Sequence, residues 1–150
     1  MIDTGKLNNM TQENKDLLLR DLSARLPYGV KCVSGVDDAI LIIEGINPNC
    51  NGTSEVQVTY ERSGINFDTK ISSIKPYLRP MSSMTEEEKK EYYNLCIEEE
   101  REEIEFGEWI TRVYYHNTIE SIDLLNKNHF DYRDLIPLGL AKDATGLNIY

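Results

Sequence analysis

The side chains best suited to chemistry are sparse in this chain of 150 residues. It holds two histidines, His116 and His129, and three cysteines, Cys32, Cys50 and Cys96. The cysteines are odd in number and widely spaced, without a CxxC pair. They therefore favour reduced thiols over a disulfide framework or a four-ligand zinc site.

Catalytic motifs are missing from the sequence. It contains neither a glycine-rich phosphate loop nor a GxSxG elbow. The one nucleophile and base that folding could bring together are Cys96 and His116, but a buried structural cysteine is the commoner case. We predict that the protein is not an enzyme and needs no cofactor. An uncharacterised enzyme ranks third among the functional hypotheses.

The strongest chemical signal is a cluster of glutamates. The chain has a net charge of −10, and residues 86–108 hold 11 acidic residues against three basic ones. Consecutive carboxylates on a rigid element can steer a basic protein surface or imitate the phosphate spacing of DNA. We predict a protein partner with a basic surface, and not nucleic acid, which attracts the opposite charge. The predicted contact residues are Glu98, Glu99, Glu102 and Glu103.

A metal site is an alternative role for the same glutamates. On a helix, Glu98 with Glu102 and Glu99 with Glu103 are i, i+4 pairs that could hold a divalent cation. No EF-hand pattern accompanies them. A solvated helix face is the favoured interpretation, so no metal is predicted.

A second functional hypothesis is nucleotide or oligonucleotide binding by the β-rich region. Lys75, Tyr77 and Arg79, with Arg62 and Lys70 nearby, place basic and aromatic groups together, as single-strand binders do. The surrounding segment holds five basic and six acidic residues, so it offers no net attraction. The alternative interpretation is that Tyr77 packs on the sheet while Lys75 and Arg79 lie along its surface.

Residues 129–133, with the sequence HFDYR, form one more cluster of chemical groups. It could be a ligand or partner site at a helix end. The structural interpretation is favoured: His129 and Arg133 lie near the carbonyls that end the helix, and Phe130 and Tyr132 enter the core.

These residues must be positioned by a small α+β fold. Thr11 is a predicted N-cap for a helix over residues 11–25, with Leu18 and Leu22 on its apolar stripe. A β-rich region over residues 27–74 follows. Its strands are predicted at 30–33, 39–46 (the central strand), 55–61 and 65–70, with a loop at 47–52. They predict an antiparallel sheet of four to five strands, either open or closed as a small SH3-like barrel.

The second half is predicted to be mainly helical. Residues 75–84, with two prolines, predict an extended connector. Thr85 and Glu88 form a capping box for a helix that runs to about residue 106. A strand at 109–115 and a helix capped by Asn117 or Thr118 complete residues 85–150. Residues 11–150 are thus predicted to be a single domain, after a flexible lead-in over residues 1–10.

The sequence also bears on location. It has no apolar run near the ~20 residues that cross a bilayer, and the N-terminus lacks a signal-peptide pattern. We expect a cytoplasmic protein that does not contact membranes. Oligomeric state is not decided by these features.

Three stretches resemble a family of short uncharacterised proteins from Bacteroidales genomes, prophages and mobile elements. They are residues 10–31 (containing LPYGVK), 74–88 (IKPYLRPMSSMTEEE) and 119–144 (containing LLNKNHFDYRDLI). The resemblance implies a small intracellular protein of phage or mobile-element origin, such as an accessory factor or inhibitor, and supplies no catalytic residues. Relatives often carry a second histidine where this chain has Asn128, so a double-histidine metal site is not implied here. Met10 matches the usual family start, which implies that residues 1–9 are an extension.

Overall fold

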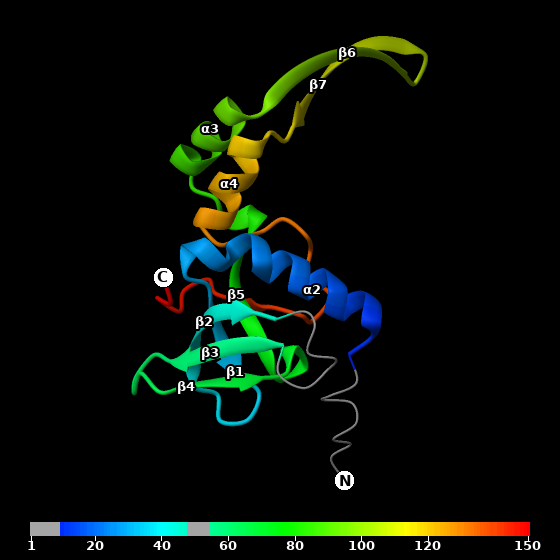
Figure 1. The fold of residues 1–150 in the computed structure, drawn as a ribbon. Coiled ribbons are helices and arrows are strands. Elements are labelled where there is room, and N and C mark those ends of the chain that lie inside the picture. The colour runs from blue at the N-terminus through cyan, green and yellow to red at the C-terminus, as the bar shows by residue number, and fades with distance from the viewer. Residues whose placement is uncertain (1–9, 48–54) are drawn as a thin grey trace.

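The computed structural model describes residues 10–47 and 55–150. One long helix lies across an open sheet, and a pair of shorter helices carries a β-hairpin that projects away from that sheet (Figure 1). The α+β class predicted from sequence is confirmed. The predicted lead-in lies almost wholly outside the described residues, as does most of the loop predicted at 47–52.

The N-terminal helix, α2 (Gln12–Arg25), forms as predicted. The Thr11 side chain accepts a hydrogen bond of 3.1 Å from the backbone N–H of Asn14 and so caps the first turn. Leu18 and Leu22, one turn apart, are fully buried against the sheet. A short turn of 3-10 helix, Leu26–Tyr28, then ends the element.

The main sheet, within the described residues, has seven strands in the order β4-β3-β2-β1-β5-β8, with β9 also paired to β5. The strands are β1 (Lys31–Ser34), β2 (Ile40–Ile46), β3 (Val56–Tyr60), β4 (Asn66–Thr69), β5 (Ile74–Pro80), β8 (Phe130–Asp131) and β9 (Lys142–Asp143). The β4-to-β5 part is antiparallel, as predicted, but β8 and β9 run parallel to β5. The sheet is therefore mixed and open, and the SH3-like barrel offered as an alternative is not formed.

The face of the sheet that packs on α2 follows the period of two expected for strands. In β3, Val56 and Val58 are buried while Gln57 between them is exposed, and Leu41 and Ile43 are buried in β2. Buried Glu55, just before β3, forms an ion pair of 2.6 Å with Lys15 of α2. Apolar burial and this ion pair together hold the helix on the sheet.

The segment predicted as an extended connector over residues 75–84 is extended for most of its length, but that part is paired within the sheet as the strand β5. The C=O of Ser73 accepts from Gly35 N–H, Tyr77 C=O accepts from the Tyr150 hydroxyl, and Arg79 N–H donates to His129 C=O. Backbone groups alternate between the two edges of a strand, so these bonds share one edge. The two prolines of the strand occupy the alternate positions, so the nitrogen that lacks a hydrogen faces the other edge.

The long helix predicted from Thr85 to about residue 106 is wrong in its second half. The capping box between Thr85 and Glu88 is present as predicted, and α3 (Glu86–Leu95) begins there. The helix ends at Leu95, and the glutamate-rich continuation is a strand, β6 (Ile97–Glu105). It pairs with β7 (Glu108–His116), which covers the strand predicted at 109–115.

The last helix, α4 (Ile119–Lys127), begins as predicted with Thr118 as its N-cap. It packs on α3 through a second apolar cluster built on Met84, Leu125 and Phe130. The described residues after 85 thus form two short helices, a hairpin and two short strands, and the prediction of a mainly helical second half is corrected. None of the described helices is long and apolar enough to cross a membrane.

A buried ion pair connects α2 with the C-terminal part of the chain. Arg25 Nε lies 2.7 Å from Asp21 Oδ2, and both side chains are fully buried. Arg25 Nη2 also donates a 2.6 Å hydrogen bond to the backbone carbonyl of Phe130 in β8. Arg133 lies 3.3 Å from the other oxygen of Asp21. The guanidinium therefore joins the helix that covers the sheet to the segment that supports α4.

The side chain of Tyr150 connects β1 and β5 at the end of their pairing. The register that pairs Cys32 with Pro76 would next pair Lys31 with Tyr77. Instead, the Tyr150 hydroxyl accepts from Lys31 N–H at 2.9 Å and donates to Tyr77 C=O at 2.8 Å. One hydroxyl thus bridges two strands where their ladder separates.

The histidine that follows α4 is held in an unusual state. His129 has φ of +63°, is 8% exposed and stacks on the Tyr150 ring with centroids 3.5 Å apart. Burial, and then the positive charges of Arg25, Arg79 and Lys31, lower the pKa of His129 to about 4. The imidazole is therefore neutral in the folded protein at neutral pH.

Replacement of Asp21 by alanine should destabilise the fold strongly. It leaves the buried Arg25 guanidinium without its counter-charge, which typically costs about 3–5 kcal/mol. Urea unfolding at pH 7 measures the loss. Asp16→Ala, on an exposed position of the same helix, is the matched control and should stay within about 0.5 kcal/mol of the wild type. Equal losses for the two variants would contradict a structural role for the pair.

His129 should make the stability of the wild type fall between pH 6.5 and pH 4. In that window the unfolded chain binds a proton at the imidazole and the folded chain does not, so the free energy of unfolding decreases as pH falls. His129→Asn cannot titrate, and asparagine tolerates a positive φ. Between pH 7 and pH 4 the unfolding free energy of the wild type should therefore fall more than that of the variant. Parallel pH profiles would contradict a lowered pKa of His129 in the folded protein.

Candidate functional site

The projecting hairpin β6–β7 is the most exposed regular element of the described chain (Figure 1). Nine residue pairs connect its strands without a register shift, from Ile97 with His116 to Glu105 with Glu108. The two loop residues have φ of +52° at Phe106 and +82° at Gly107. Positive φ at both positions is typical of a type I′ turn, whose twist matches that of the strands.

The register divides the hairpin into two faces, because directly opposed residues point to the same side. We call one the ionic face, which carries Ile97, Glu99, Arg101, Glu103, Glu105, Glu108, Ile110, Arg112, Tyr114 and His116. We call the other the mixed face, which carries Glu98, Glu100, Glu102, Ile104, Trp109, Thr111, Val113 and Tyr115.

The charged side chains of the ionic face mostly form ion pairs with one another. Arg101 binds both oxygens of Glu99, at 2.6 and 3.1 Å, and lies over the Tyr114 ring. Arg112 pairs with Glu103 and with Glu105. Among the described residues, every charged side chain of this face except Glu108 therefore has a partner.

His116 adds to the same network. Its Nε2 lies 2.6 Å from Glu99 Oε2. Hydrogen bonds from Arg101 and then from His116 lower the pKa of Glu99 to about 2. Glu99 is therefore ionised at any physiological pH, and its charge is balanced within the hairpin.

The mixed face differs because it carries three glutamates and no lysine or arginine. Glu98, Glu100 and Glu102 follow one another along β6, and none forms an ion pair with another described residue. Across from them lie Trp109, Thr111, Val113 and Tyr115 of β7. A row of carboxylates thus runs beside a largely apolar row.

The apolar groups become more exposed toward the tip. Trp109 is 71% exposed and its opposed neighbour Ile104 is 62% exposed. Phe106, in the turn itself, is 99% exposed. Large apolar side chains gathered on one projecting element are typical of an interaction surface.

The base of the hairpin is fixed to the two short helices. The Tyr115 ring packs on Tyr93 of α3 with centroids 4.4 Å apart. Tyr92 donates a 2.6 Å hydrogen bond to Asn117, and Thr118 donates one of 2.7 Å to the carbonyl of Leu95. These contacts hold the first pairs of the hairpin, so the arm has a defined direction relative to the sheet.

The four glutamates predicted as one contact surface are divided by this geometry. Glu98 and Glu102 lie on the mixed face, whereas Glu99 and Glu103 lie on the ionic face and already have partners. Residues four apart in a strand are separated by about 13 Å, so the helical i, i+4 pairs considered for a cation do not exist. Among the described residues, no group of three potential metal ligands comes together.

Sequence reasoning missed Glu100 and the aromatic residues of the hairpin as site residues. The signal is present in the chain: Trp109, Thr111, Val113 and Tyr115 share one parity, and so do Glu98, Glu100 and Glu102. A two-residue turn ending in Gly107 would have paired the two series.

Lys75, Tyr77 and Arg79 share one face of β5, as their spacing requires. Arg79 is engaged, because its guanidinium binds both oxygens of Glu88 at 2.8 Å and lies over the Phe130 ring. These contacts agree with the structural interpretation of this segment.

The other groups considered for chemistry also have structural partners. Cys96 Sγ lies 4.0 Å from the Asn117 carbonyl oxygen, and His116 binds Glu99. In the HFDYR segment, His129, Phe130 and Asp131 are buried, as the structural interpretation expects for Phe130.

Comparison with protein-family models, with curated proteins and with solved structures gives no match for this chain. Function must therefore be inferred from the geometry of the described residues.

The single tryptophan of the chain offers a direct test of the hairpin. Trp109 should fluoresce as a water-exposed indole in the native protein, be quenched readily by acrylamide, and change little in emission maximum on unfolding. A helix packed in the core would instead bury an aromatic residue of this size. A blue-shifted native emission that moves to longer wavelength in urea would contradict the projecting hairpin.

Proposed function

We propose that the protein is a non-enzymatic interaction protein that binds a basic, amphipathic segment of another protein on the mixed face of its hairpin. The observation that carries this proposal is the row of unpaired glutamates beside the exposed row from Trp109 to Tyr115. A partner helix that carries a stripe of lysines or arginines beside a stripe of apolar residues would satisfy both rows at once.

Side-chain chemistry supports a protein partner. Aromatic residues dominate the energetics of protein interfaces, and Trp109, Phe106 and Tyr115 are all at least partly accessible. The glutamates would add electrostatic attraction, which accelerates association and selects basic partners. Glu98 and Glu102, two of the contact residues expected from sequence, remain in this proposal, with Glu100 added.

Charge argues against a second copy as the occupant. The hairpin carries seven glutamates and two arginines, and two such faces would oppose like charges. A basic partner removes that repulsion, whereas a homodimer would increase it. The proposal therefore commits to a different chain.

The absence of catalysis, a cytoplasmic location and a role as a phage or mobile-element accessory factor or inhibitor are further parts of the proposal. They rest on the sequence features and on the family resemblance. The alternative of oligonucleotide binding through Lys75, Tyr77 and Arg79 ranks lower, because Arg79 is bound on both sides by Glu88 and Phe130.

A designed peptide tests the mixed face directly, whatever the natural partner. A helical peptide with a stripe of lysines beside a stripe of leucines should bind the protein and change Trp109 fluorescence, with an affinity that falls as salt screens the charges. The triple variant Glu98→Gln, Glu100→Gln, Glu102→Gln should bind about tenfold more weakly. Trp109→Ala should lose about 2 kcal/mol or more of binding free energy, measured by calorimetry.

Matched controls separate the mixed face from total charge. Glu44→Gln, Glu87→Gln, Glu91→Gln removes three exposed glutamates outside the hairpin and should bind like the wild type. The same helical peptide with glutamates in place of the lysines should not bind. Equal weakening by the two triple variants, or binding that survives Trp109→Ala, would reject the mixed face as the site.

A further inference from the structure

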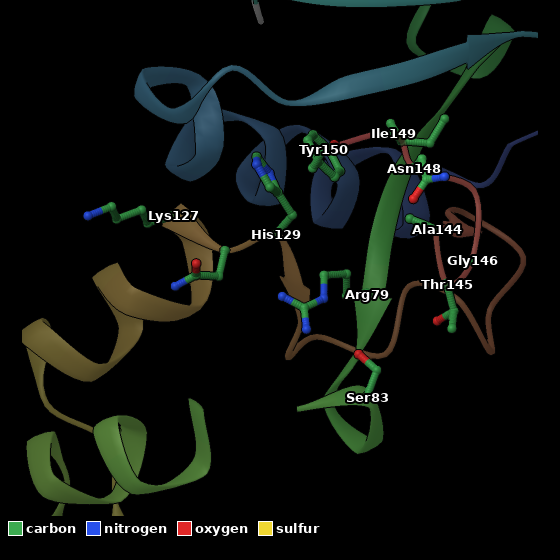
Figure 2. Close-up of a pocket in the computed structure, with 11 residues that line it drawn as sticks. Arg79, Ser83, Lys127, His129, Ala144, Thr145, Gly146, Asn148, Ile149 and Tyr150 are labelled. Carbon is green, nitrogen blue, oxygen red and sulfur yellow. The ribbon is translucent and has the colours of Figure 1, made fainter. Parts of the chain in front are cut away.

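A pocket of about 510 Å³ lies at the C-terminal end of α4, whereas the hairpin joins this helix at its N-terminal end. Its wall is built from three parts of the chain: the end of β5, the C-terminal end of α4 and the segment from Ala144 to Tyr150. Figure 2 shows His129 and Tyr150 above Arg79, with Lys127 on one side and Thr145 on the other. Its volume is sufficient for a small metabolite.

The charge of the pocket is opposite to that of the molecule. The lining includes Arg79 and Lys127 and no aspartate or glutamate, although the chain has a net charge of −10. Arg79 is paired with Glu88, so the unbalanced positive charge of the lining is that of Lys127. Lys127 forms no ion pair with another described residue. A cationic pocket on an acidic protein is a local departure that composition does not explain.

His129 reports the same positive environment. Besides burial, the charges of Arg25, Arg79 and Lys31 lower its pKa. Its ring is more than nine-tenths buried, and the buried atom Nδ1 has no hydrogen-bond partner among the described residues. A bound anion would reduce the electrostatic penalty that keeps this imidazole neutral.

The rest of the lining offers neutral groups suited to a polar ligand with an apolar part. Ser83, Asn128, Thr145 and Asn148 contribute hydroxyl and amide groups, and Gly146 brings backbone to the surface. Ile149 and the Tyr150 ring form an apolar wall. Such a combination of apolar wall and convergent polar groups is typical of ligand pockets.

We propose that this pocket binds a small organic phosphate, with the phosphate between Arg79 and Lys127 and the organic part against Ile149 and Tyr150. Arg79 uses two of its five N–H donors on Glu88, so three N–H donors remain for an anion. Glu88 balances the charge of Arg79, so the positive charge that attracts the phosphate comes from Lys127. The site is independent of the mixed face and of the function proposed for it.

AMP and adenosine are probes that differ by the phosphate alone. Millimolar AMP should raise the melting temperature of the protein and shift the imidazole NMR signals of His129, whereas adenosine should do neither. Inorganic phosphate should shift the same signals more weakly, since it leaves the apolar wall uncovered.

Two exposed lysines provide the matched variants. Lys127→Gln should reduce the affinity for AMP about tenfold, the effect of one lost charge-assisted contact. Lys90→Gln, on α3 outside the pocket, should leave the affinity unchanged. The proposal is overturned if AMP shifts neither the melting temperature nor the His129 signals, if adenosine acts equally, or if the two variants weaken AMP binding to the same degree. Retained peptide binding on the mixed face in Lys127→Gln would keep the two sites distinguishable.

Discussion

The buried ion pair between Asp21 and Arg25 is the contact on which the arrangement of the molecule depends. Two desolvated charges add little net stability, because the loss of hydration offsets their attraction. Their value here is positional. Arg25 also donates a hydrogen bond to the Phe130 carbonyl, so α2 is joined to the short strand β8. Phe130 in turn packs with Leu125 of α4 in the second apolar cluster. The direction of the hairpin relative to the sheet depends on this guanidinium together with the pairing of β8 to β5 and the ion pair of Arg79 with Glu88, because the hairpin is rooted on α3 and α4 and not on the sheet.

The hairpin has one face whose contacts stabilise it and one face whose groups have few partners. A two-stranded ribbon is marginally stable by itself in water. The ionic face supplies internal order through Arg101, Arg112 and their glutamates, and Tyr115 packs on Tyr93 at the base. The mixed face has no such closure, and its exposed aromatic groups and unpaired carboxylates point to solvent. The pocket beside His129 is separate: its walls come from segments far apart in sequence, and its charge is opposite.

Local patterns predict the parts of the fold that local forces decide. Helix α2, the capping box at Thr85 and the alternating strand β3 are readable from spacing, as is an N-cap at Asn117 or Thr118. The second half of the glutamate run suggests a helix because glutamate favours helices. In the structure this segment is the strand β6, because it pairs along its whole length with β7. The prolines of β5 suggest a connector because proline lacks the N–H group that a strand donates. Whether that missing donor matters depends on which strand edge the nitrogen faces, and only tertiary pairing decides this. The pocket could not be predicted, since Arg79, Lys127 and Tyr150 meet only through long-range packing.

The uninterrupted register of the hairpin constrains how such an arm can change in length. An insertion of one residue in either strand would exchange the faces beyond it, placing carboxylates among the arginines and aromatic groups on the wrong side. Insertion of two residues in each strand would preserve both faces and extend the reach of the tip by about 7 Å. Variation among related arms should therefore occur in even steps, with the turn at Phe106 and Gly107 carried outward unchanged. The distance to a partner can in this way be adjusted while the chemistry that recognises it is kept.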